Sequence, residues 1–136
     1  MKTAIIYWSQ TGNTQAMAEN ILAGIRKEGG EADIFAVSEI SPAEAAAYDV
    51  LLLGCPAMGA EELESEEFEP FYTELEALVP GKKVGLFGSY DWGDGEWMRL
   101  WQERAEGAGL HVEDTLIVNM NDDPAEPCMA FGKQFA

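Results

Sequence analysis

The stretch from Thr3 to Lys27, TAIIYWSQTGNTQAMAENILAGIRK, contains a strand, a polar turn and a helix in succession. Thr3 to Trp8 is rich in β-favouring apolar residues and predicts a strand. Asn13 to Lys27 predicts a helix, because its apolar residues recur at the spacing of one buried helix face. The Gly29-Gly30 pair then ends the helix, so the stretch predicts the first half of a βαβ unit.

The same alternation continues to the end of the chain. Apolar runs predict further strands at Ala32–Val37, Val50–Gly54 and Val84–Gly88, with Leu116–Val118 inside a fifth. Helical patterns predict helices at Ala43–Ala47, Phe68–Leu78, Glu96–Glu106 and Cys128–Phe135. The sequence therefore predicts an α/β fold, a doubly wound five-stranded parallel sheet with helices on both faces. Ligands of such sheets bind beyond the carboxyl ends of the strands, where the strand order reverses.

Length and charge narrow the class of protein. The 136 residues suit one domain, 1–136, and 47% of them are hydrophobic, as in ordinary globular proteins. With 25 acidic and 8 basic residues, the net charge is −17. Such a charge repels nucleic acids and anionic membranes, and it favours partner proteins with basic docking surfaces. We expect no nucleic-acid or membrane partner, and a monomer.

Targeting signals and reactive side chains are scarce. As to targeting signals, the sequence has neither a secretory leader pattern nor an apolar run long enough to span a membrane, so we expect a cytoplasmic protein. Cys55 follows a very apolar run, where we expect a buried reduced thiol in preference to a disulfide with Cys128 or a metal ligand. His111 is the only histidine, so neither a histidine-rich metal site nor a Ser-His-Asp triad is expected.

The loop after the first strand has the composition of a phosphate site. It brings hydroxyl and amide groups and a glycine to a helix N-terminus, where backbone N–H groups and the helix dipole favour an anion. Its residues are Ser9, Gln10, Thr11, Gly12, Asn13 and Thr14. The loop contains no lysine and does not match the dinucleotide fingerprint. A cluster of helix-capping residues that binds nothing is the alternative.

The loops after strands three and four display apolar side chains in unusual places. Met58 and Trp92 lie in glycine-flanked turns, outside the spacing of a core. Such residues often pack against a ligand or partner, although a turn residue folded back on the surface is the alternative. A planar aromatic ring held between the Met58 thioether and the Trp92 indole would explain both.

Three motifs carry a resemblance to a known family. Ser9-x-Thr11-Gly12-Asn13-Thr14, Gly54-Cys55-Pro56-Ala57-Met58-Gly59 and Gly88-Ser89-Tyr90-x-Trp92-Gly93-x-Gly95 resemble the three FMN loops of short-chain flavodoxins of anaerobic bacteria. The resemblance extends over nearly the whole chain. It implies FMN as the cofactor, strand order 2-1-3-4-5, and low-potential one-electron transfer between redox enzymes, mainly by semiquinone and hydroquinone.

The resemblance also implies individual roles. The residues from Ser9 to Thr14 would hold the FMN phosphate. Met58 would cover one face of the isoalloxazine ring and Trp92 the other, while Glu61 would accept a hydrogen bond from the ring N3–H. The peptide at Met58-Gly59 would rearrange to stabilise the neutral semiquinone. The expected FMN contacts in the second and third loops are Pro56, Ala57, Met58, Gly59, Ala60, Glu61, Ser89, Tyr90, Asp91, Trp92, Gly93 and Asp94.

Two positions depart from the family pattern, and acidic residues surround the expected flavin. Ala60 stands where a polar residue is common, and Asp91 stands where glycine is usual. The acidic residues in or beside the loops are Glu61, Glu62, Glu64, Asp91, Asp94 and Glu96. Their charge predicts a strongly negative semiquinone/hydroquinone couple, weakened by salt, which screens exposed charges beyond ~10 Å at 0.1 M.

Three other functions remain as alternatives. An NAD(P)H-dependent flavin or quinone reductase would need room over the flavin for a second ligand. Met58 on one face and Trp92 on the other leave little such room. A signalling receiver domain would need acidic residues after the first strand and an aspartate ending the third, where this chain has Ser9 and Gly54. A flavin-binding module without redox duty would share every binding residue.

Overall fold

The computed structural model describes residues 2–10, 12–58 and 62–136 and contains one five-stranded sheet. Every neighbouring pair of strands is parallel, and the order is β2-β1-β3-β4-β5, which confirms the predicted architecture. The strands are β1 (Thr3–Tyr7), β2 (Asp33–Ala36), β3 (Val50–Gly54), β4 (Lys83–Tyr90) and β5 (His111–Asn119).

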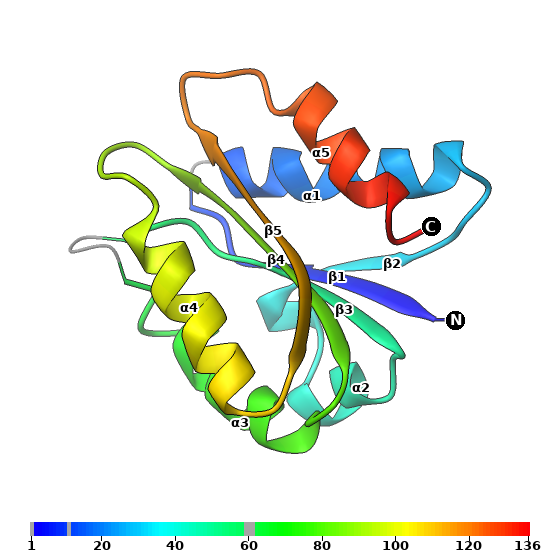
Figure 1. Ribbon diagram of the computed structural model, residues 1–136, viewed down its shortest axis with the longest axis vertical. Helices are drawn as coiled ribbons and strands as arrows, with labels where there is room; N and C mark the ends of the chain where they lie inside the picture. Colours follow the sequence, from blue (N-terminus) through cyan, green and yellow to red (C-terminus); the bar gives the residue numbers. More distant parts are fainter. Residues whose placement is uncertain (1, 11, 59–61) are drawn as a thin grey trace.

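Helices cover both faces of this sheet (Figure 1). The helices are α1 (Asn13–Lys27), α2 (Pro42–Ala46), α3 (Phe68–Leu78), α4 (Glu96–Gly107) and α5 (Ala125–Lys133), with a short 3-10 turn η1 at Val37–Glu39. Figure 1 shows α1 and α5 together on one face, with α3 and α4 on the other. Successive residues of the fully buried β3 alternate between the two cores: Leu52 packs under α1 and α5, while Leu51 and Leu53 pack toward α3 and α4.

Helices α1 and α5 cross at very short range because glycines face the crossing. A Cβ built on Gly24 of α1 would collide with the Met129 backbone, and one on Gly132 of α5 would collide with the Ile21 backbone. The missing side chains let two helix backbones touch, as close helix packing requires. This contact ties the C-terminal helix to the first one.

The prediction for β4 was too short, and Leu116–Val118 lies inside β5 as predicted. β4 continues through Ser89 and Tyr90, predicted as loop, because these residues still pair with Val118 and Asn119 of β5. β5 begins at His111, well before Leu116, and its charged first half is exposed at the sheet edge. Backbone pairing overrides the polar pattern there, since an edge strand has solvent on one side.

The boundaries of α2 and α5 differ from the predicted ones. α2 begins one residue early, at Pro42, because Ser41 and Glu44 form a reciprocal capping box. α5 begins at Ala125, directly after Pro124, and ends before the predicted Phe135. Within the described residues, no helix is long and apolar enough to cross a membrane.

Candidate functional site

A cavity of about 240 Å³ lies at the carboxyl ends of β1, β3 and β4. This is the place where the strand order reverses, since β1 stands between β2 and β3. In Figure 1 the carboxyl ends of these three strands lie at one edge of the sheet, away from both chain ends. The cavity is lined by Ser9, Gln10, Thr14, Pro56, Ala57, Met58, Ser89, Asp91, Trp92 and Met120.

One end of the cavity offers hydroxyl groups at a helix N-terminus. Gly12 is the N-cap of α1 with a φ of 95°, a left-handed conformation that favours glycine. A glycine cap has no side-chain oxygen to occupy the N–H groups of the first turn, and that turn contains no acidic residue. The buried Thr14 hydroxyl lies 2.8 Å from the Ser89 hydroxyl of β4. These groups are hydrogen-bond donors without a neighbouring carboxylate in the turn, which suits a phosphate.

The second loop reaches the cavity through hydrogen bonds to β4 and to its own returning strand. The Ala57 N–H donates to the Ser89 carbonyl at 3.0 Å, which holds the loop beside the end of β4. Met58 and Glu62 exchange two backbone hydrogen bonds, of 2.8 and 2.9 Å, in an isolated antiparallel bridge. Met58 is therefore held beside the cavity by the hydrogen bond at Ala57 and by its own two hydrogen bonds to Glu62.

The third loop carries an indole that is largely open to solvent. The Trp92 side chain lines the cavity yet remains 61% exposed. An exposed tryptophan beside a cavity is unusual, because large apolar side chains are normally packed away from water. By contrast, the preceding Tyr90 packs on Trp97 of α4, with ring centroids 5.8 Å apart. The loop thus presents one aromatic residue outward and anchors itself with another.

The structure brings together nine of the predicted site residues and adds one that sequence reasoning missed. Met120 follows β5 and lines the cavity, and its N–H donates to the Tyr90 carbonyl at 2.8 Å. The pairing of β5 beside β4 was the available signal for it. Predicted site residues that lie near the cavity but do not line it are Gly12, Asn13, Tyr90, Gly93 and Asp94. Thr11, Gly59, Ala60 and Glu61 lie outside the described residues.

Charge is distributed unevenly over the molecule. Exposed acidic side chains next to the loops include Glu62, Asp91, Asp94 and Glu96. Of the eight Lys and Arg residues, only Arg99 and Arg104 are on α4, and both are ion-paired, with Asp94 and with Glu69 and Glu76. The others lie near the amino ends of strands or the carboxyl ends of helices: Lys2, Arg26, Lys27, Lys82, Lys83 and Lys133. The cavity therefore opens on the acidic side of the molecule.

Both cysteines are free and buried, which confirms the prediction for Cys55. Burial raises the pKa of the Cys55 thiol to about 12, and burial does the same for the pKa of Cys128. Neither thiol is a thiolate nucleophile at neutral pH. His111 lies at the surface beside Glu113, 2.9 Å away, and the described residues contain no group of three potential metal ligands.

The donor set fits a phosphate-bearing planar ligand. The buried hydroxyls of Thr14 and Ser89 and the N-terminus of α1 supply polar groups to the cavity, while Met58, Trp92 and Met120 supply apolar ones. Gly88 allows the end of β4 to lie close to Cys55, which directly follows β3, because a Cβ on Gly88 would collide with the Cys55 carbonyl oxygen. The cavity can thus hold an anionic tail inside and a flat ring near its mouth.

Comparisons with known proteins point to one family. The family model for flavodoxin matches residues 5–132. Flavodoxins from Megasphaera elsdenii and Clostridium beijerinckii are each 48% identical to this chain, over 132 and 134 residues, 97% of the chain; the matches cover 96% and 97% of those proteins. The solution structure of two-electron reduced Megasphaera elsdenii flavodoxin superposes with a TM-score of 0.90, covering 96% of each chain.

Proposed function

This chain belongs to the flavodoxin family, whose members bind FMN and are electron carriers rather than enzymes, and we propose that it carries single electrons between redox enzymes. In this proposal the non-covalently bound FMN works at low potential, mainly between its semiquinone and hydroquinone forms. The cofactor supplies the electron chemistry, and the chain supplies binding and electrostatic tuning.

The single observation that carries the proposal is the cavity between α1 and the second and third loops, which combines buried hydroxyls with apolar side chains. Its Thr14 and Ser89 hydroxyls would hold the phosphate, and Met58 and Trp92 would lie along the ring. Because Trp92 is largely exposed, the ring would lie close to the surface. An electron could then pass to a docked partner without the flavin leaving the protein.

Acidic groups near the cavity support the low potential. Glu62, Asp91, Asp94 and Glu96 are exposed on that side, so negative charge added to the flavin meets like charges. Glu64 differs from the other acidic residues singled out in the sequence, because it is 7% exposed and accepts hydrogen bonds from backbone N–H groups. Its charge is compensated locally by these N–H groups.

The same surface supports partners with basic docking faces. The basic side chains outside α4 lie toward the far end of the sheet, so a positively charged partner would meet the cavity end first. Electron-transfer rates with a basic reductase are then expected to fall as ionic strength rises, as stopped-flow kinetics would show. Rates independent of salt would contradict this docking mode. A net charge of −17 also favours a monomer.

A cytoplasmic location belongs to the same proposal. Cys55 and Cys128 are both reduced and buried, which suits a reducing compartment. Fractionation of the source cells, followed by immunoblotting, would test the location. Recovery in an oxidising compartment would contradict it.

An anaerobic reductive titration with dithionite, followed by visible absorbance, tests the main proposal. Oxidised-flavin bands that give way first to a long-wavelength absorption and then to bleaching would support one-electron transfer on FMN. Direct two-electron bleaching, together with NAD(P)H oxidation by the purified protein alone, would favour a flavin or quinone reductase. A protein that cannot take up FMN would overturn the proposal.

A further inference from the structure

The second loop is closed at its base by contacts that sequence analysis did not reveal. We call the base of this loop the neck, and it comprises residues 55–58 and 62–64. The Glu64 N–H donates to the Cys55 sulfur at 3.4 Å, and one step farther out Met58 and Glu62 exchange their two backbone hydrogen bonds. The two strands of the neck are therefore joined at two successive levels, and the inner level depends on one buried sulfur atom.

Glu64 connects the neck to helix α3. One carboxylate oxygen accepts from the N–H groups of Glu67 and Phe68, at 2.7 and 2.9 Å, and the other accepts from Glu66 at 2.9 Å. Backbone N–H groups at the start of a helix lack partners within the helix, so this carboxylate caps α3. The position of the Glu64 backbone is thus set by the helix on one side and by Cys55 on the other.

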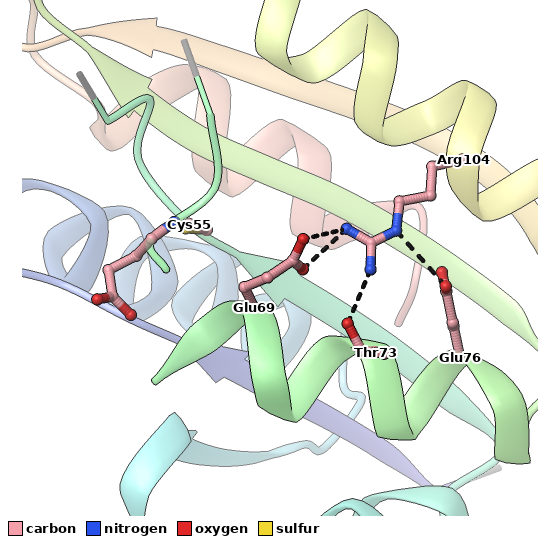
Figure 2. A network of polar contacts seen from close by, with 6 residues as sticks. Cys55, Glu69, Thr73, Glu76 and Arg104 are labelled. Atoms are coloured by element: carbon pink, nitrogen blue, oxygen red, sulfur yellow. Dashed lines mark hydrogen bonds and ion pairs between the residues drawn. The ribbon is translucent and has the colours of Figure 1, made fainter. Parts of the chain in front are cut away.

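Helix α3 is in turn fixed to α4, and α4 leads back to Cys55. Figure 2 shows the Arg104 guanidinium reaching across to Glu69, Thr73 and Glu76 of α3, with Nη1 at 2.7 Å from Glu69 and Nε at 3.5 Å from Glu76. On α4, the buried Trp97 indole N–H points to the Cys55 carbonyl at 3.4 Å. The contacts form a closed circuit, and Cys55 within it directly precedes Pro56, which lines the cavity.

We propose that Cys55 is a positioning residue for the flavin: its sulfur holds the Glu64 N–H and thereby fixes where the Met58–Glu62 bridge lies against the cavity. The inference rests on the proposed function for its flavin readout. Cys55 itself is fully buried and does not line the cavity, so it acts through the neck alone. Met58, which does line the cavity, is three residues away and is tied to Glu62 by the two backbone hydrogen bonds of the bridge.

The physical reason is preorganisation. Groups held in place before charge arrives stabilise that charge without having to reorganise. A Cys55→Ala variant leaves the buried Glu64 N–H without the acceptor that the structure gives it, and an unmet buried donor drives the neck to rearrange. Met58 and the peptide groups beside it would then be less well placed against the reduced flavin.

The chain contains a matched control. Cys128 of α5 is also free and fully buried, but it belongs to the core on the opposite face of the sheet. Truncating either cysteine to alanine removes the same sulfur atom from a packed interior. The comparison between Cys55→Ala and Cys128→Ala therefore separates a general loss of packing from an effect on the neck.

The experiment uses the FMN-bound protein and its two variants. For Cys55→Ala we expect the potential of the first one-electron reduction to fall by about 40 mV. This corresponds to about a fivefold loss of affinity for the one-electron-reduced flavin relative to the oxidised flavin. Amide hydrogen exchange at Glu64 should accelerate, with or without FMN. Cys128→Ala should leave both readouts at the wild-type values. Cys55→Ser keeps an acceptor and a donor at this position and should recover part of the potential.

Equal potentials in Cys55→Ala and Cys128→Ala would overturn the proposal, as would unchanged exchange at Glu64. If Cys55→Ala fails to fold, Cys55→Val, which fills the space but offers no acceptor, carries the test, with Cys128→Val as its control. Equal potentials in these two variants would then overturn the proposal. If the wild-type protein bound no FMN, the proposed function would fail, and hydrogen exchange alone would still decide whether Cys55 holds the neck.

Discussion

Thr14 of helix α1 and Ser89 of strand β4, 75 positions apart in the chain, place their hydroxyl oxygens 2.8 Å from each other in the buried wall of the cavity. This pair joins the loop that follows β1 to the end of β4. Both hydroxyls face a helix N-terminus, so a phosphate bound there would be recognised by two elements at once.

Replacing Thr14 with valine keeps the shape of the side chain but removes its hydroxyl group. A hydrogen bond to a charged group contributes about 1.5–3 kcal/mol, so we expect the FMN dissociation constant to rise roughly tenfold or more. Fluorescence titration of the FMN-free protein would measure it. Thr115→Val, in β5 outside the cavity, is the control. An unchanged constant in Thr14→Val would show that the phosphate binds elsewhere.

Trp92→Ala should weaken FMN binding without destabilising the fold. The indole is 61% exposed, and removal of an exposed side chain normally alters the free energy of unfolding by less than about 0.5 kcal/mol. An aromatic stacking contact is worth about 0.5–1.5 kcal/mol, so an increase in the dissociation constant of several-fold is expected, with a change in the visible spectrum of the bound flavin. Leu100→Ala, at 53% exposure, is the control. Equal effects of the two substitutions on FMN binding would contradict the placement of Trp92.

Neutralising acidic residues near the cavity should raise the potential of the second one-electron reduction. At ~10 Å in water each charge contributes about 0.4 kcal/mol, so the triple variant Asp91→Asn, Asp94→Asn, Glu96→Gln should raise it by roughly 50 mV at low salt. Potentiometric titration would measure the shift, which should shrink as salt is added.

The control for this shift is a triple variant of exposed acids elsewhere on α3 and α4: Glu74→Gln, Glu103→Gln and Glu106→Gln. It carries the same change in net charge. If both triple variants moved the potential equally, net charge would be responsible, and the position of the acids beside the cavity would have no special effect.

Glu64→Gln should destabilise the protein in a pH-dependent manner. Burial raises the pKa of Glu64, but hydrogen bonds from Phe68, Glu66 and Glu67 outweigh this, so its pKa in the folded protein lies below the ordinary value. The carboxylate therefore stabilises the fold above the pKa of the unfolded chain, and this contribution is lost as the pH falls through the lowered pKa. We expect a cost of about 1–2 kcal/mol at neutral pH.

Urea unfolding of wild type and variant at neutral and acidic pH would measure this difference. The difference in unfolding free energy should narrow as the pH falls. Glu66→Gln, whose side chain is exposed, should show no such trend. A pH-independent cost for Glu64→Gln would mean that its charge does not contribute to the cap.

The fold was predictable because its signals are local. The uninterrupted apolar run at Val50–Gly54 predicted the central strand, and the helical spacing from Asn13 to Lys27 predicted α1 with both boundaries correct. The start of β5 was harder to predict, because the charged first half of this strand resembles a loop and only its pairing with β4 makes it a strand. Ser89 and Tyr90, predicted as loop, belong to β4 for the same reason.

The residue types at the ends of the strands can be read directly from the sequence. They sufficed to predict the phosphate-type loop at Ser9–Thr14 and the displayed Met58 and Trp92. Hydrophobic period and turn chemistry act over a few residues, so one sequence suffices to read them. Only the tertiary structure decided that Thr14 meets Ser89, that Met120 completes the cavity and that Cys55 holds Glu64. Those contacts depend on strand order, register and rotamers, which are set by the packing of the whole chain and leave no local pattern.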